Sequence, residues 1–165
     1  MTRSSLILAV LAALLAGCQS KPAPEATQAP ASPAAAKPAP PPVKPSDETR
    51  RFPPAHREDV VVVLDHLLGK DFLPGGNLAT YKKGGRDYQM FLVKGKDASE
   101  PALWLLDLKK GMTDAKLVPG FGGYFGADSG KPLFAFTKNN YLAGVVGLPR
   151  KDADAAAREL AVRIP

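Results

Sequence analysis

The sequence predicts an α+β domain with two layers, in which helices pack on one face of a largely antiparallel sheet of hairpins. Two pairs of strand-like segments are each joined by a short turn of glycines or asparagines, and two segments with helical periodicity lie outside these pairs. Turns this short join antiparallel strands, because a parallel pair needs a crossover of a dozen or more residues.

The first hairpin is predicted from residues 78–81 and 88–93, which are rich in aromatic and aliphatic side chains. Between them stand Gly84 and Gly85, which supply the positive φ that a tight reversal requires. We therefore expect two antiparallel strands here.

The second hairpin pairs residues 133–137 with residues 141–146 around Asn139 and Asn140. Asparagine tolerates the left-handed conformation that both central positions of a type I′ turn adopt. A further strand is expected over residues 121–127, and a segment rich in turn-forming residues joins it to this hairpin.

Two helices are predicted beside the hairpins. One covers residues 102–110, with Ser99 as a capping hydroxyl, Pro101 in the first turn and Gly111 at its end. The other covers residues 152–163 and is amphipathic, so it is expected to pack on the sheet. Its apolar stripe is formed by Ala153, Ala157, Leu160, Ala161 and Ile164.

Residues 58–68 fit two structures. Four consecutive valines favour a strand, because β-branching stiffens χ1. The acidic beginning and the ending His66-Leu67-Leu68-Gly69 suit a helix of about three turns. We expect a helix here, and a strand is the alternative.

These elements place a single α+β domain at residues 57–165, a length that suits one core. From Arg57 onward there are 16 Lys or Arg and 13 Asp or Glu, so the domain carries a net charge of only +3. This excess is too small to predict a nucleic-acid partner.

The chain begins with the features of an export signal. Arg3 precedes an unbroken apolar run over residues 6–15. This run is too short to cross a hydrocarbon core of about 30 Å, but it has the length of a signal-peptide apolar region. Residues 1–17 are therefore predicted to be a signal peptide.

The residues that end at the only cysteine, Leu15-Ala16-Gly17-Cys18, resemble the lipobox of bacterial lipoproteins. The resemblance implies cleavage before Cys18 and acylation of its thiol, which would hold the protein to membrane lipid. Gln19 implies sorting to the outer membrane, where the protein would face the periplasm. A plain secretory signal with an incidental cysteine is the alternative. A lipidated Cys18 leaves no thiol for a disulfide, a nucleophile or a thiolate metal site.

Residues 18–56 are predicted to be the lipidated cysteine followed by a disordered tether rich in proline and alanine. Eleven of the chain's 17 prolines lie between Pro22 and Pro54, and each removes an N–H donor and fixes φ. With a rise of about 3.1 Å per residue where it is stiff, such a tether reaches at most on the order of 100 Å. Recognition of its proline spacing by a proline-binding module is the alternative.

No catalytic, cofactor or metal site is expected. The two histidines, His56 and His66, have no zinc-binding spacing. Asp65 and His66 suggest half of a catalytic triad, but no Gly-x-Ser-x-Gly motif supplies the nucleophile. Ser99 and Ser129 are instead interpreted as a helix cap and a turn residue.

Three other features have a structural and a binding interpretation. Residues 120–126 contain the glycines of a phosphate-binding loop but lead to a turn instead of a helix, so they are interpreted as a strand with close packing. Residues 128–131 are interpreted as a turn and not as an anion site. Trp104 is expected in the core, with a partner surface as the alternative.

The order of residues 78–93, the glycine-aromatic stretch, residues 134–146 and the closing helix resembles a bacterial domain family of unknown function found in exported proteins. This resemblance transfers no site residues. We expect a non-enzymatic envelope lipoprotein that presents a small domain to an envelope protein or to the cell wall. The alternatives are a small-molecule carrier or sensor with a pocket between sheet and helices, and an envelope hydrolase with a site around His66.

Overall fold

The computed structural model describes residues 44–165. The predicted signal peptide, Cys18 and most of the predicted tether lie outside the described residues. Within the described part of the chain, no helix has both the length and the apolar character needed to cross a membrane.

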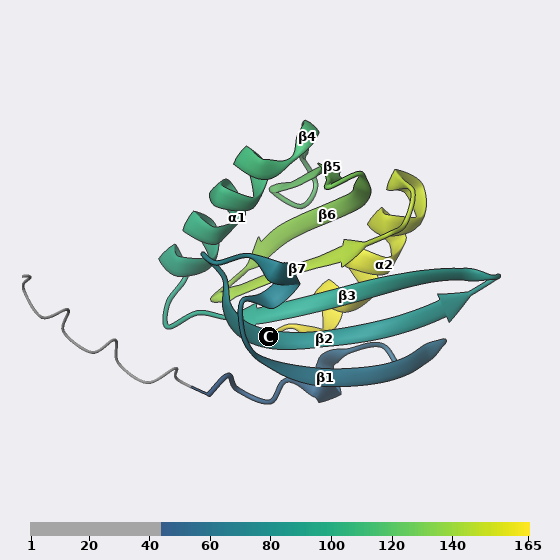
Figure 1. Cartoon of the computed structure of the whole chain (residues 1–165), viewed down its shortest axis with the longest axis horizontal. Helices are drawn as coiled ribbons and strands as arrows, with labels where there is room; N and C mark the ends of the chain where they lie inside the picture. The colour runs from purple at the N-terminus through teal and green to yellow at the C-terminus, as the bar shows by residue number, and fades with distance from the viewer. Residues whose placement is uncertain (1–43) are drawn as a thin grey trace, which may run out of the picture. The chain divides into compact units, whose positions relative to one another are not determined.

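Seven strands form one antiparallel sheet in the order β1-β2-β3-β7-β6-β5-β4 (Figure 1), so the α+β class and the sheet of hairpins are confirmed. Two helices and two short 3-10 turns complete the fold. In chain order the elements are η1 (Thr49–Arg51), β1 (Arg57–Asp65), η2 (Leu67–Gly69), β2 (Pro74–Lys83), β3 (Arg86–Lys94), α1 (Ser99–Gly111), β4 (Thr113–Val118), β5 (Gly123–Asp128), β6 (Lys131–Lys138), β7 (Tyr141–Val146) and α2 (Arg150–Arg163).

Two meanders build this sheet, and the pairing of β3 with β7 joins them at its centre. Phe91 of β3 lies opposite Gly144 of β7. A Cβ on Gly144 would lie 2.5 Å from the Phe91 ring and 2.3 Å from the Phe134 carbonyl oxygen. Only glycine therefore lets the Phe91 ring lie this close to the neighbouring strand.

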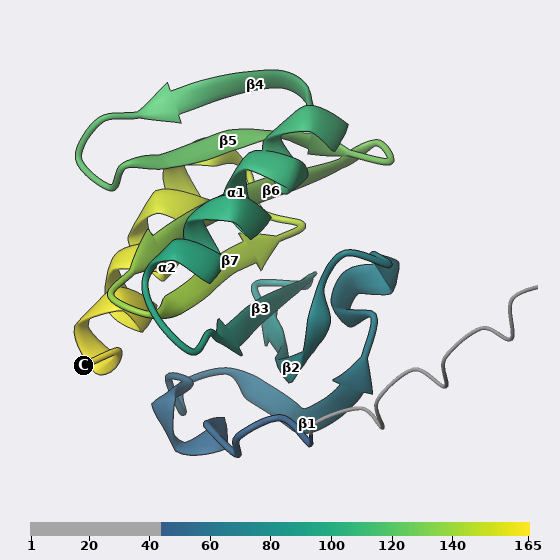
Figure 2. The same cartoon turned by 90° about the vertical axis from the view of Figure 1, so that its left-hand side faces the viewer.

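The two helices pack on opposite faces of the sheet, which corrects the expectation of two layers with both helices on one face (Figure 2). On one face, Leu105 and Leu108 of α1 join a core cluster with Phe91, Leu133 and Leu142. We call this the α1 face.

On the other face, Ala157 and Leu160 of α2 join a core cluster with Met90, Phe134 and Val145. We call this the α2 face. Because both faces are covered, residues 133–136 of β6 and 141–145 of β7 are buried without a break. Continuous burial is typical of strands that have a layer on either side.

Residues 57–65 form strand β1 and not the expected helix. They pair with β2 from Arg57 opposite Tyr81 to Asp65 opposite Pro74. The backbone then turns at His66, which has a φ of 52°. The valines favour this outcome because β-branched side chains fit a pleated strand, and β2 supplies the backbone partners that a strand needs.

The folded domain begins before residue 57, which corrects the expected end of the tether. Phe52 is 1% exposed and lies in the α2-face core. The Tyr81 hydroxyl donates a hydrogen bond to the Pro53 carbonyl at 2.9 Å. A single aromatic side chain thus draws a proline-rich segment into the core, because its burial removes a large apolar area from water.

The remaining local predictions are mostly confirmed. Gly84 and Gly85 have φ values of 58° and 76° in the first hairpin, whereas only Asn139 of the asparagine pair has a positive φ. The first turn of α1 is capped by Asp97 and not by Ser99, since the Asp97 carboxylate accepts the Ser99 N–H at 2.8 Å. Strand β4 is an addition, and its mostly exposed polar residues gave no apolar pattern.

Candidate functional site

The histidines named from the sequence are not brought together. His56 and His66 lie at opposite ends of β1. The His56 carbonyl accepts the Lys82 N–H at 2.9 Å, and the His66 Nδ1 atom lies 3.3 Å from the Asp65 carboxylate. Among residues 44–165, no three His, Cys, Asp or Glu side chains are grouped as metal ligands.

The glycine-rich stretch and the turn after it are parts of the sheet, so both structural interpretations are confirmed. β5 begins at Gly123, where a Cβ would lie 2.4 Å from the Ala135 carbonyl oxygen of β6. Ser129 and Gly130 have φ values of 50° and 77° and form the reversal between β5 and β6. Trp104 is half-buried against the α1-face core.

A buried polar cluster fixes the N-terminal segment to the α2 face. Glu48 is 8% exposed. Its carboxylate accepts a hydrogen bond from the Tyr141 hydroxyl at 3.2 Å, pairs with Lys94 at 3.3 Å and pairs with Arg51. The Glu48 backbone N–H donates to the Asn77 side-chain oxygen at 3.0 Å. We call these five residues the Glu48 cluster.

The charges of this cluster compensate one another. Burial raises the pKa of Glu48 and is the largest single influence, but hydrogen bonds from Arg51, Lys94 and Tyr141 and the charge of Arg51 together outweigh it. The pKa of Glu48 therefore lies below its ordinary value of 4.5. Hydrogen bonding to Glu48 likewise raises the pKa of Lys94 above 10.5.

The polar groups of the Glu48 cluster are paired with one another, so the cluster is interpreted as structural. Among the described residues, no fully buried side-chain nitrogen or oxygen lacks a hydrogen-bond partner. The cluster joins the N-terminal segment to β2, β3 and β7. Its two most distant members, Glu48 and Tyr141, are 93 positions apart in the sequence. Sequence spacing gave no sign of it, because the sheet order brings these residues together.

The free edge of β1 is the feature best suited to another protein chain. β1 is the outermost strand at one side of the sheet (Figure 1), is nine residues long and contains no proline. Val61 and Leu64 are 43% and 61% exposed. An uncovered edge presents unpaired backbone groups to which a further strand can bind.

Two aspartates limit the open part of this edge. The Asp59 carboxylate accepts the Val60 N–H at 2.8 Å, and the Asp65 carboxylate accepts the His66 N–H at 2.9 Å. N–H groups alternate between the two sides of a strand, so Val62 and Leu64 direct theirs to the same side as Val60, away from β2. The open donors of the β1 edge are therefore those of Val62 and Leu64.

An apolar hollow of about 440 Å³ lies between the sheet and α2. Val118, Phe125 and Phe134 from β4, β5 and β6 form its apolar lining, and the first turn of α2 supplies Arg150 and Lys151 at its rim. Asp154 also lines it and pairs with Arg158 at 2.9 Å. The hollow exists because α2 covers β6 and β7 but leaves β4 and β5 partly open on this face.

Comparison of the chain with protein-family models, curated proteins and solved structures finds no match.

We predict that Glu48→Gln lowers the free energy of unfolding by about 1–3 kcal/mol at neutral pH, because it removes the charge that Arg51 and Lys94 share. The folded state lowers the pKa of Glu48. Its ionised form therefore stabilises the fold above its ordinary pKa, and this contribution is lost as the pH falls through the folded-state pKa. Denaturant unfolding from about pH 6 to about pH 3 measures the difference.

The control is Glu58→Gln, which changes an exposed glutamate in the same way. Its effect is expected to stay within about 0.5 kcal/mol at every pH. Equal, pH-independent losses in both variants would show that the Glu48 cluster does not hold the segment in place.

Proposed function

We propose that this chain is a lipid-anchored envelope protein whose domain binds, without catalysis, an extended segment of a partner protein along the edge of β1. The open Val62 and Leu64 donors on an uncovered edge strand are the observation that supports it. Addition of a strand to such an edge is a common mode of peptide recognition.

The charge around the edge favours a basic partner segment. Glu58, Asp59 and Asp65 carry negative charge along β1, and all three are exposed. The single opposite charge on the strand, Arg57, is directed elsewhere, since its guanidinium donates to the Phe52 carbonyl at 3.1 Å. A partner with lysine or arginine beside its apolar residues therefore complements this edge.

We predict that Val62→Pro in the full chain weakens binding of a synthetic eight-residue peptide that alternates lysine with valine. Proline removes the outward N–H but leaves the hydrogen bonds to β2, as edge strands tolerate. The loss of one hydrogen bond is expected to weaken the peptide about tenfold. Fluorescence anisotropy of the labelled peptide measures the affinity.

Val62→Thr is the matched control, since it keeps the N–H and the β-branched shape, and it is expected to bind within about twofold of wild type. Equal binding by Val62→Pro would contradict the proposal. A second copy of the chain on this edge would also overturn it, and light scattering would then show a dimer that Val62→Pro dissociates.

We further propose that acyl chains on Cys18 anchor the protein in the outer membrane, facing the periplasm. The resemblance of residues 15–18 to a lipobox supports this, together with the export signal before them. One acyl chain holds a protein only marginally, whereas two or three hold it stably.

We predict that Cys18→Ser abolishes lipidation, because serine lacks the thiol that accepts the diacylglycerol. Intact-mass spectrometry of the wild-type protein is expected to show a chain that begins at Cys18 and carries acyl chains. An unmodified thiol in the wild type, or a leader still attached, would contradict the anchor and leave the β1 proposal untouched.

A small-molecule carrier or sensor is the second candidate, and the apolar hollow beside α2 favours it. Its apolar lining suits a hydrophobic group, and Arg150 and Lys151 suit an acidic one. The fitting ligand class is therefore an apolar molecule with one anionic group.

For this candidate we predict that Val118→Trp reduces the fluorescence of bound anilinonaphthalene sulfonate, an apolar anionic dye, by about half or more, because the indole fills the hollow. Leu117→Trp is the matched control, since Leu117 is next to Val118 in the sequence but is 53% exposed and does not line the hollow. Equal fluorescence of the two variants would exclude the hollow as the dye site.

A further inference from the structure

A second hollow, of about 330 Å³, lies where the N-terminal segment, β1 and the end of α2 meet. Thr49, Phe52, Pro54 and Val60 line part of it. The other three lining residues are Arg50, Arg57 and Arg163, which we call the arginine triplet.

Within residues 44–165, no acidic side chain forms an ion pair with the arginine triplet. Seven arginines lie in residues 44–165. Three of them form ion pairs, Arg51 with Glu48, Arg86 with Asp152 and Arg158 with Asp154. No ion pair within 4.0 Å joins any of the other four to a described carboxylate, and three of these four form the triplet.

The walls of this hollow are tied together. The Arg57 guanidinium donates to the Phe52 carbonyl at 3.1 Å, and the Arg51 guanidinium donates to the Arg163 carbonyl at 2.9 Å. These bonds join β1 and the end of α2 to the same N-terminal segment. The hollow is thus formed before any ligand arrives.

Asp47 lies three residues before Arg50 of the triplet. Its carboxylate accepts the Thr49 N–H at 3.0 Å and the Thr49 hydroxyl at 2.7 Å. These bonds lower the pKa of Asp47, and the charge of Arg50 adds to the effect. Asp47 thus offsets part of the charge of Arg50.

Three guanidinium groups around one hollow suit a phosphate group. Arginine stays charged at all physiological pH values, and its planar donors match the oxygens of phosphate. The hollow has the volume of about ten water molecules, so it also has room for the glycerol that a phospholipid headgroup carries beside its phosphate.

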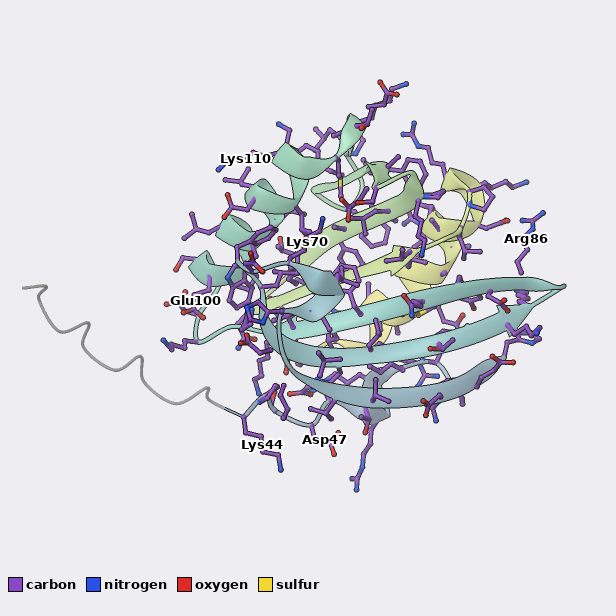
Figure 3. All side chains as sticks on the ribbon, in the orientation of Figure 1. Lys44, Asp47, Lys70, Arg86, Glu100 and Lys110 are labelled. Carbon is purple, nitrogen blue, oxygen red and sulfur yellow. The ribbon has the colours of Figure 1, made fainter. Side chains whose placement is uncertain are left out.

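The position of the hollow on the chain points to a membrane as the source of that phosphate. The hollow includes Thr49 and Arg50 of η1, close to where the described chain begins at Lys44. Lys44 and Asp47 project from this segment away from the sheet (Figure 3). Only 25 residues separate Cys18 from Lys44, and a tether of that length keeps the domain at high local concentration beside its own bilayer.

We propose that the arginine triplet binds the phosphate of an anionic phospholipid headgroup, so that the domain rests on the bilayer with its N-terminal segment toward the lipid. This proposal rests on the proposed lipid anchor at Cys18 only in naming the membrane as the source of the phosphate. The affinity for phosphate follows from the triplet itself.

The test uses the full chain in vesicles of phosphatidylcholine, with or without phosphatidylglycerol, and measures modification of each arginine by phenylglyoxal with peptide mass spectrometry. Phosphatidylglycerol is expected to slow modification of Arg50, Arg57 and Arg163 about threefold or more, and added salt is expected to reverse this. Arg86 is the internal control, since its side chain is 60% exposed, belongs to none of the proposed sites and is expected to react at the same rate in both vesicles.

Two variants separate the site from general attraction of charge. Arg163→Gln is expected to remove most of the protection of Arg57, whereas Arg86→Gln, which changes the net charge equally, is expected to leave it intact. Equal loss in both variants would overturn the site.

Two further measurements identify the source of the phosphate and show whether the anchor is present. The membrane assignment would be overturned if inorganic phosphate protected the triplet in phosphatidylcholine vesicles and phosphatidylglycerol gave no further protection. Intact mass of the same sample reports acylation of Cys18. Unprotected arginines on an acylated chain would therefore refute the triplet proposal without affecting the anchor.

Discussion

The pairing of β3 with β7 holds the rest of the domain together, because it is the only strand pairing among residues 44–165 that joins the two meanders. Phe91 and Gly144 meet in this pairing, and the close approach of ring to backbone leaves no room for a side chain. Both helices pack over this central region, one on each face. Burial on both faces supplies the apolar area that a domain of this size needs.

The N-terminal segment makes the third contribution to the core. Phe52 fills space beside α2, while the Glu48 cluster satisfies the polar groups that its burial would leave unpaired. Packing and hydrogen bonding thus act on the same segment. As a result, residues 48–52 are held at a fixed place on the domain, where they form part of the hollow that the arginine triplet lines.

The candidate binding surfaces arise where this coverage is incomplete. β1 has no neighbour on its outer side, and α2 leaves β4 and β5 partly open. The two aspartates that cap the ends of the β1 edge narrow it to a short open stretch, which limits nonspecific pairing. A selective edge and a small hollow are both consistent with a binding domain.

The sequence by itself determined the two hairpins, the two helices and the α+β class, because turn residues such as Gly84 and Gly85 and the stripe through Ala157 act locally. It also contained a pattern that indicates three layers, since the apolar runs at residues 133–136 and 141–145 are continuous and do not alternate with polar residues. Tertiary structure alone decided the strand at β1, the opposite faces of the helices, the Glu48 cluster and the arginine triplet. Each depends on partners distant in the chain, and local propensity carries no information about which partner a strand edge or a carboxylate will meet.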